Sequence, residues 1–186
     1  MLCSLRLAAV FIGAVALSAA AADSVLDLKG RPVNPFDNPS RVHVLLFVRT
    51  DCPITNRYAP ELQRIAEKYR SQPVDFWLVY PDASETPSNV ESAIRHYAFP
   101  GTPVLDIHHV LVKRAQATIA PEAAVFAPEG TLSYHGRIDD RFVDIGKARP
   151  EAQEHDLDQA IAAVLAGHTV KQRVTRAVGC YLADVE

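Results

Sequence analysis

The cysteines are the side chains of this chain best suited to chemistry, and there are three among its 186 residues. Cys3 stands near the start, Cys52 directly follows an apolar run, and Cys180 lies close to the C-terminus. A thiolate attacks disulfides and binds soft metal ions, and two thiols can join in a disulfide. The chain therefore carries groups for redox chemistry or metal binding.

The N-terminal segment decides which cysteines remain in the mature protein. Residues 1–22 have the pattern of a secretory signal peptide: Arg6 is the only charge, an apolar run follows it, and three alanines end the segment. The alternative is an uncleaved anchor, although the apolar run is shorter than the about 20 residues of a spanning helix. Cleavage removes Cys3. We therefore predict a periplasmic or secreted protein with two cysteines, no stable membrane span and an oxidising environment.

Cys52 stands between a predicted strand at residues 42–48 and a predicted helix at residues 55–69. The strand is almost continuously apolar, as in strands buried on both faces, and the helix repeats apolar residues at helical spacing. Such a turn opens at the edge of an α/β sheet where ligands usually bind, and the helix dipole lowers a thiol pKa there. A reactive thiol and a small buried residue both fit this position.

The remaining pattern alternates strands and helices. It predicts strands at residues 74–80, 104–105, 122–127 and 131–136, and helices at residues 88–97, 109–117 and 156–166. This order indicates one α/β domain with a central mixed sheet flanked by helices. Residues 171–186 have the character of a C-terminal tail that carries Cys180.

Composition and charge exclude several classes of function. The 19 basic and 22 acidic residues give a net charge of −3, and no stripe of basic residues indicates a nucleic-acid partner. No glycine-rich dinucleotide motif or P-loop is present, so we predict no organic cofactor. Histidines are expected at the surface or at helix caps. Asp139 and Asp140 lie beside Arg137 and Arg141, which predicts a solvated ion-pair network after the hairpin.

The segment Phe47-Val48-Arg49-Thr50-Asp51-Cys52-Pro53-Ile54-Thr55 resembles the active-site strand, turn and helix of the thioredoxin superfamily, and more narrowly its secreted redoxin branch. A second similarity lies at residues 120–126: that family has a cis-proline facing the active-site cysteine, and Pro121 takes this position. A third lies at residues 128–140, which resemble the family's terminal hairpin. The resemblance implies a thioredoxin-like domain at residues 23–170.

The chain departs from this family at four positions. Thr55 replaces the second cysteine of the Cys-x-x-Cys motif. Leu45 and Arg49 stand where peroxiredoxins carry proline and threonine, and Asn56 stands where copper-delivery relatives carry a second cysteine. A dithiol within the turn, a standard peroxide site and a standard copper site are therefore all incomplete.

The resemblance implies a thiol–disulfide oxidoreductase in which Cys52 is the nucleophile, Thr55 bonds its sulfur and Pro121 shapes the substrate groove. Cys180 is the candidate resolving cysteine, while a free or intermolecular thiol and a metal ligand remain open for it. The substrate would be a thiol or disulfide of a protein or small molecule. The alternatives are a thiol peroxidase and a non-catalytic module that binds copper or a protein partner.

Overall fold

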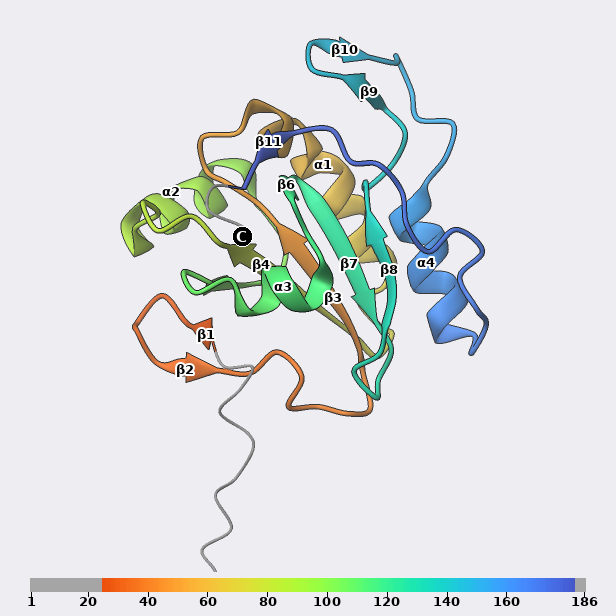
Figure 1. Ribbon diagram of the computed structural model, residues 1–186, viewed down its shortest axis with the longest axis horizontal. Coiled ribbons are helices and arrows are strands. Elements are labelled where there is room, and N and C mark those ends of the chain that lie inside the picture. Colours follow the sequence, from red (N-terminus) through yellow and green to blue (C-terminus); the bar gives the residue numbers. More distant parts are fainter. Residues whose placement is uncertain (1–24, 183–186) are drawn as a thin grey trace, which may run out of the picture.

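The computed structural model describes residues 25–182, so the predicted signal peptide lies outside the described residues. Seven strands form one mixed sheet in the order β2-β1-β5-β4-β3-β7-β8. Central β3 runs parallel to β4 and antiparallel to β7 (Figure 1). The strands are β1 Val25–Leu26, β2 Pro32–Val33, β3 Val42–Phe47, β4 Val74–Tyr80, β5 Thr102–Leu105, β7 Glu122–Phe126 and β8 Leu132–Gly136.

Helices cover both faces of the sheet: α1 Pro53–Lys68, α2 Pro87–Tyr97, α3 Val110–Ala115 and α4 Asp156–Leu165. Val44 and Leu46 of β3 belong to a core with residues of α1, α2 and α4. Leu45 and Phe47 face the opposite way and pack in a second core with α3. All four side chains are at most 1% exposed. This double burial explains why the strand is apolar without alternation.

Element boundaries follow local chemistry. Strand β4 has the predicted bounds, whereas α1 begins at Pro53, two residues earlier than predicted, because the fixed φ of proline suits the first helical position. Helix α2 is capped by the Thr86 hydroxyl, which accepts the Asn89 N–H. Helix α3 begins after His109, which the sequence had placed inside the helix.

Six short strands, paired two by two, carry no clear sequence pattern. Strands β1 and β2 form a hairpin, and β9 Phe142–Asp144 pairs with β10 Lys147–Ala148 in a second hairpin that projects from the body (Figure 1). Strand β6 Ile119–Ala120 pairs antiparallel with β11 Cys180–Tyr181. Residues 171–182 therefore run along the domain, and Leu182 at their end is buried.

Two expectations about polar residues are wrong. Asp139 and Asp140 are only 4% and 5% exposed, and their carboxylates accept hydrogen bonds from Tyr58 and from the backbone N–H groups of Gln153 and Glu154. These buried hydrogen bonds fix both ends of the segment that carries β9 and β10. The two carboxylates are therefore structural and do not form a solvated ion-pair network.

The second wrong expectation is that the histidines lie at the surface or at helix caps. His43 lies in β3 with no exposed surface. Within residues 25–182, no helix has the length and apolar character needed to cross a membrane.

Candidate active site

Cys52 lies at the junction of β3 and α1, where it is the N-cap residue of the helix. Its side chain has no exposed surface. The first helical residue is a proline, so the nearest free backbone N–H groups of the helix belong to Ile54 and Thr55. The positive end of the helix thus faces the sulfur, as the sequence predicted from the strand–turn–helix order.

The surroundings favour the thiolate of Cys52. Burial acts to raise the pKa of this thiol, but hydrogen bonds from Cys180, Thr55 and Ile54 outweigh it and hold the pKa below the ordinary 9.0. The buried Thr55 hydroxyl has no other partner in the described part of the chain. Thr55 thus acts to lower the pKa of Cys52 although it replaces the second cysteine of the motif.

Cys180 reaches Cys52 from the far end of the chain. The two Sγ atoms lie 2.7 Å apart, with both cysteines as free thiols. The Cys52 Sγ–H also donates to the Ala120 carbonyl oxygen at 3.3 Å, and Cys180 is the strand partner of that same alanine. The Ala120–Pro121 peptide bond is cis. The four predicted residues therefore meet at one place, between the start of α1 and the β6–β11 ladder.

The second thiol has the opposite electrostatic setting. Burial, together with the hydrogen bond and the negative charge of Cys52, raises the pKa of Cys180 to about 12. The first proton to leave the pair therefore comes from Cys52, and Cys180 keeps its own. When Cys52 loses its proton, its thiolate can accept a hydrogen bond from the Cys180 thiol, as a nucleophile with a resolving partner in reach would.

Residues 174–182, which we call the strap, hold Cys180 in place. At its start, Val174 bridges to His135 of β8. The Thr175 hydroxyl then bonds with the Tyr134 hydroxyl at 2.6 Å and accepts the Arg137 N–H at 3.0 Å. These contacts lie on the edge of the sheet. The strap then crosses to β6, where β11 forms (Figure 1).

Close contacts fix the end of the strap. A Cβ added to Gly179 would collide with the carbonyl group of Ala120. Beyond the two ladder pairs, the Leu182 N–H donates to the Thr118 carbonyl oxygen. The Gly-Cys step in the sequence indicated a close backbone approach, and this is where it occurs.

Arg49 is a site residue that the sequence analysis did not place. Its guanidinium forms ion pairs with Asp51 at 3.0 Å and with Asp82 at 3.1 Å, and it donates to the Tyr181 carbonyl oxygen at 3.5 Å. It therefore links the active-site turn to the strap. Only the proximity of Arg49 to Cys52 in sequence hinted at this role, since Asp82 and Tyr181 are remote along the chain.

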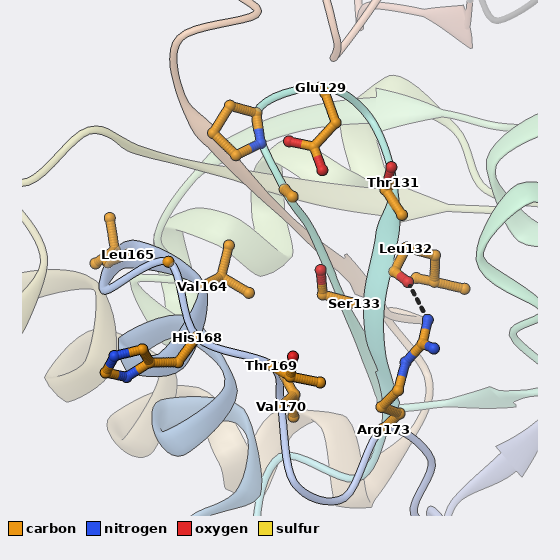
Figure 2. Close-up of a pocket in the computed structure, with 13 residues that line it drawn as sticks. Glu129, Thr131, Leu132, Ser133, Val164, Leu165, His168, Thr169, Val170 and Arg173 are labelled. Atoms are coloured by element: carbon orange, nitrogen blue, oxygen red, sulfur yellow. Dashed lines mark hydrogen bonds between the residues drawn. The ribbon is translucent and has the colours of Figure 1, made fainter.

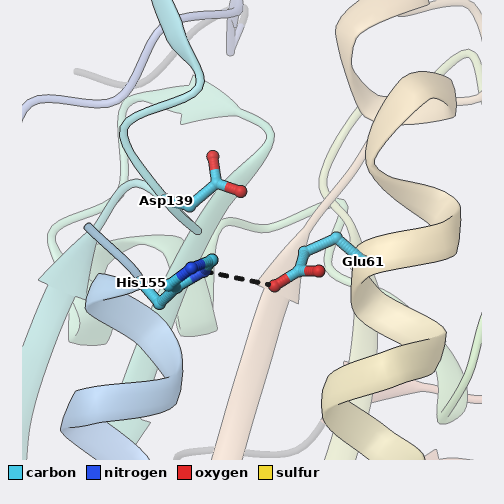
Figure 3. A group of neighbouring side chains, drawn as sticks. All are labelled: Glu61, Asp139 and His155. Carbon is cyan, nitrogen blue, oxygen red and sulfur yellow. Dashed lines mark ion pairs between the residues drawn. The ribbon is translucent and has the colours of Figure 1, made fainter. Parts of the chain in front are cut away.

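One other cluster has metal-ligating side chains. Glu61, Asp139 and His155 each offer a ligand atom within 4.8 Å of the others (Figure 3). Glu61 and His155 form an ion pair at 3.7 Å, and Asp139 accepts the Tyr58 hydroxyl at 2.6 Å. These pairings account for the cluster. Within residues 25–182, no histidine or carboxylate joins the two cysteine sulfurs in a comparable group.

A pocket of about 460 Å³ lies between the β7–β8 turn and the end of α4, with Glu129, His168 and Arg173 among its lining residues (Figure 2). The Arg173 guanidinium donates to the Leu132 carbonyl oxygen across it. Because β7 runs antiparallel to β3, this turn lies beside the start of β3, whereas Cys52 follows its end. The pocket is therefore at the opposite end of the sheet from the thiols.

No model of a known protein family matches the chain, and no curated protein matches it. Solved structures do match. A hypothetical protein from Sinorhizobium meliloti superimposes with a TM-score of 0.70 at 22% identity, covering 85% of this chain and 88% of that one. A thiol:disulfide interchange protein of the thioredoxin family from Chlorobium tepidum gives 0.56 at 16% identity, covering 76% and 92%. The chain has a thioredoxin-like fold.

A secreted disulfide oxidoreductase from Mycobacterium tuberculosis, described as homologous to Escherichia coli DsbE, is also similar. It gives a TM-score of 0.54 at 19% identity, covering 81% of this chain and 99% of that one. Identities this low establish the architecture and confirm the fold predicted from residues 47–55 and 120–140. The chemistry has to be argued from the thiols themselves.

Proposed function

We propose that the protein is a periplasmic or secreted thiol–disulfide oxidoreductase, with Cys52 as nucleophile and Cys180 as resolving cysteine. The observation that carries the proposal is the 2.7 Å separation of two sulfurs with opposite pKa shifts. The predicted signal peptide and the similarity to a secreted disulfide oxidoreductase support the location.

The first step forms a mixed disulfide. The Cys52 thiolate attacks one sulfur of a substrate disulfide, a new S–S bond forms to Cys52, and the old S–S bond breaks. The other substrate sulfur leaves as a thiolate and takes a proton from solvent. Thr55 holds the attacking sulfur through its hydroxyl and N–H, and Pro121 follows the carbonyl group that faces this sulfur.

The second step releases the substrate. Once Cys52 is in a mixed disulfide, its negative charge is gone, and with it one cause of the raised pKa of Cys180. Cys180 then loses its proton to solvent and attacks the Cys52 sulfur, so that a Cys52–Cys180 disulfide forms and the substrate thiolate leaves. The substrate gains two electrons and the protein loses two. A thiol or dithiol reductant of the same compartment would restore the two thiols.

Reduction of a protein disulfide, with insulin as substrate and a dithiol as electron donor, tests the proposal. We expect Cys52→Ser to abolish the activity. Cys180→Ser should instead accumulate a mixed disulfide at Cys52, which mass spectrometry of the unreduced protein detects. Full activity in Cys52→Ser would overturn the assignment.

The same variants separate the alternatives. Peroxide consumption that depends on Cys52 and exceeds insulin reduction would favour a thiol peroxidase. One equivalent of bound copper that is lost in Cys180→Ser, without disulfide reduction, would favour a binding module.

A further inference from the structure

The strap covers the sulfur that the proposed function requires to be reached. Cys52 has no exposed surface, and its Sγ contacts the Cys180 Sγ, the Ala120 carbonyl oxygen and the first turn of α1. The helix and β6 belong to the packed body, whereas β11 is held by a two-residue ladder, by the hydrogen bond from Leu182 to Thr118 and by the contact of Arg49 with the Tyr181 carbonyl oxygen. The place where β11 now lies is therefore an approach by which a substrate disulfide can contact the Cys52 sulfur.

Removing β11 leaves backbone groups of β6 without partners. Strand β11 pairs with Ile119 and Ala120, and the Leu182 N–H bonds to the Thr118 carbonyl oxygen. Ala120 has no exposed surface with β11 in place, so the loss of β11 uncovers these backbone groups and exchanges strand pairing for water. An extended polypeptide lying antiparallel to β6 restores these bonds, whereas a small disulfide does not.

The register of β11 then specifies what such a polypeptide must contain. A substrate cysteine in the place of Cys180 lies opposite Ala120, next to the Cys52 sulfur. The preceding residue takes the place of Gly179, where a Cβ would collide with the Ala120 carbonyl group and come within 2.8 Å of the Ile119 side chain. The colliding atoms are mainly backbone, which cannot move cheaply.

The residue after the cysteine is under no such restriction. Tyr181 is 76% exposed, so its place on the strap tolerates a change of side chain. The selectivity therefore acts on one side of the cysteine only.

We propose that β11 occupies the site of the substrate, and that the preferred substrate is an extended protein segment in which glycine directly precedes the reacting cysteine. This inference rests on the proposed function, since it concerns what approaches Cys52. The strap is then a built-in copy of the substrate: Cys180 attacks the mixed disulfide from the displaced strap, and β11 pairs with β6 again once the segment has left.

Activated peptides test the inference on the full-length Cys180→Ser protein, in which Cys52 is the reacting thiol. The probes are peptides with the sequence of residues 177–182, their cysteine joined through a disulfide to a chromophoric aromatic thiol. One peptide has the native sequence, a second has alanine in place of Gly179, and a matched control has alanine in place of Tyr181. Release of the chromophore gives the rate of mixed-disulfide formation.

We expect the peptide with alanine at the glycine position to react about tenfold to a hundredfold more slowly than the native peptide. The peptide altered at the tyrosine position should match the native one within about threefold. The same comparison in Cys180→Ala guards against a perturbation specific to serine.

Equal rates for the native peptide and the peptide altered at the glycine position would overturn the inference, while insulin reduction by the wild type would leave the proposed function standing. If no probe modifies Cys52 and the wild type does not reduce insulin, both fail together.

Discussion

At the scale of single residues, two identical thiols acquire different chemistry from their surroundings. Cys52 receives hydrogen bonds from the first turn of α1, and its pKa falls. Cys180 is partly buried beside that negative sulfur, and its pKa rises. The division into nucleophile and resolving cysteine therefore comes from the position of one helix, and it does not require a second cysteine in the turn.

Thr55→Val tests this at the first turn of α1. Valine keeps the size and branching of threonine but removes the hydroxyl donor, so the pKa of Cys52 should rise by about one unit. A smaller fraction of thiolate is then present at neutral pH. Titration of the thiolate ultraviolet absorbance in a Cys180→Ser background measures the pKa of Cys52. Thr102→Val, at an exposed position of β5, is the matched control and should leave this pKa unchanged.

At the scale of elements, the sequence predicts those helices and strands that are long enough to show a hydrophobic period. Strand β4 and the turn at Cys52 fall in this group, since a buried strand and an amphipathic helix each carry a period. Strand β11 does not, because two residues make a strand only through their pairing with residues 119–120. The meeting of the two thiols depends on that pairing, so the sequence alone left it open.

The buried carboxylates were misjudged for a related reason. Asp139 and Asp140 stand between arginines in the sequence, but the groups they bind, Tyr58 and the backbone N–H groups of residues 153–154, are distant along the chain. Sequence neighbours indicate an ion pair, whereas the fold supplies different partners. Arg137 accordingly pairs with Asp156.

Gly179→Ala tests the strap as an element. The added methyl group must displace β11 from the Ala120 carbonyl group, which separates Cys180 from Cys52. We expect the Cys52–Cys180 disulfide to form at least about tenfold more slowly in a glutathione buffer. Thiol trapping followed by mass spectrometry measures the rate. Tyr181→Ala, at an exposed position two residues further along, is the control and should leave the rate unchanged. An unchanged rate in Gly179→Ala would contradict the close approach of Gly179 to the Ala120 carbonyl group.

At the scale of the whole molecule, a bond between the two thiols closes a loop across most of the domain. The cysteines are 128 positions apart, so a disulfide restricts the unfolded chain strongly. We expect the oxidised protein to resist denaturant better than the reduced protein by about 5 kcal/mol. Urea unfolding of both forms measures this difference, with Cys180→Ser as a control that redox conditions should not affect. A less stable oxidised form would instead indicate a strongly oxidising disulfide.

His43 gives the molecule as a whole a dependence on pH. It lies in β3 with no exposed surface, and its Nδ1 is 4.0 Å from a carboxylate oxygen of Asp75. Burial lowers its pKa below the ordinary 6.5, and the positive charges of Arg114 and Arg41 act in the same direction, against the carboxylate of Asp75. The folded protein thus binds this proton less readily than the unfolded chain does.

The sign of the effect on stability follows. A histidine with a lowered pKa in the folded state stabilises the fold fully above pH 6.5, and this contribution is lost as the pH falls below that value. His43→Leu should therefore flatten the pH dependence of the unfolding free energy below pH 6.5, by up to about 1.4 kcal/mol for each pH unit. Urea titrations at a series of pH values measure the slope.

His96→Leu is the matched control for this prediction, because His96 is exposed on α2. Its removal should leave the slope as in the wild type. If His43→Leu also left the slope unchanged, the acid sensitivity would have to come from carboxylates whose pKa the fold lowers, such as Asp140 and Asp158. His43 is the second residue of the central strand, and Cys52 follows the end of that strand. Because the two lie at opposite ends of β3, we expect the pH dependence of the core to be independent of the chemistry of the two thiols.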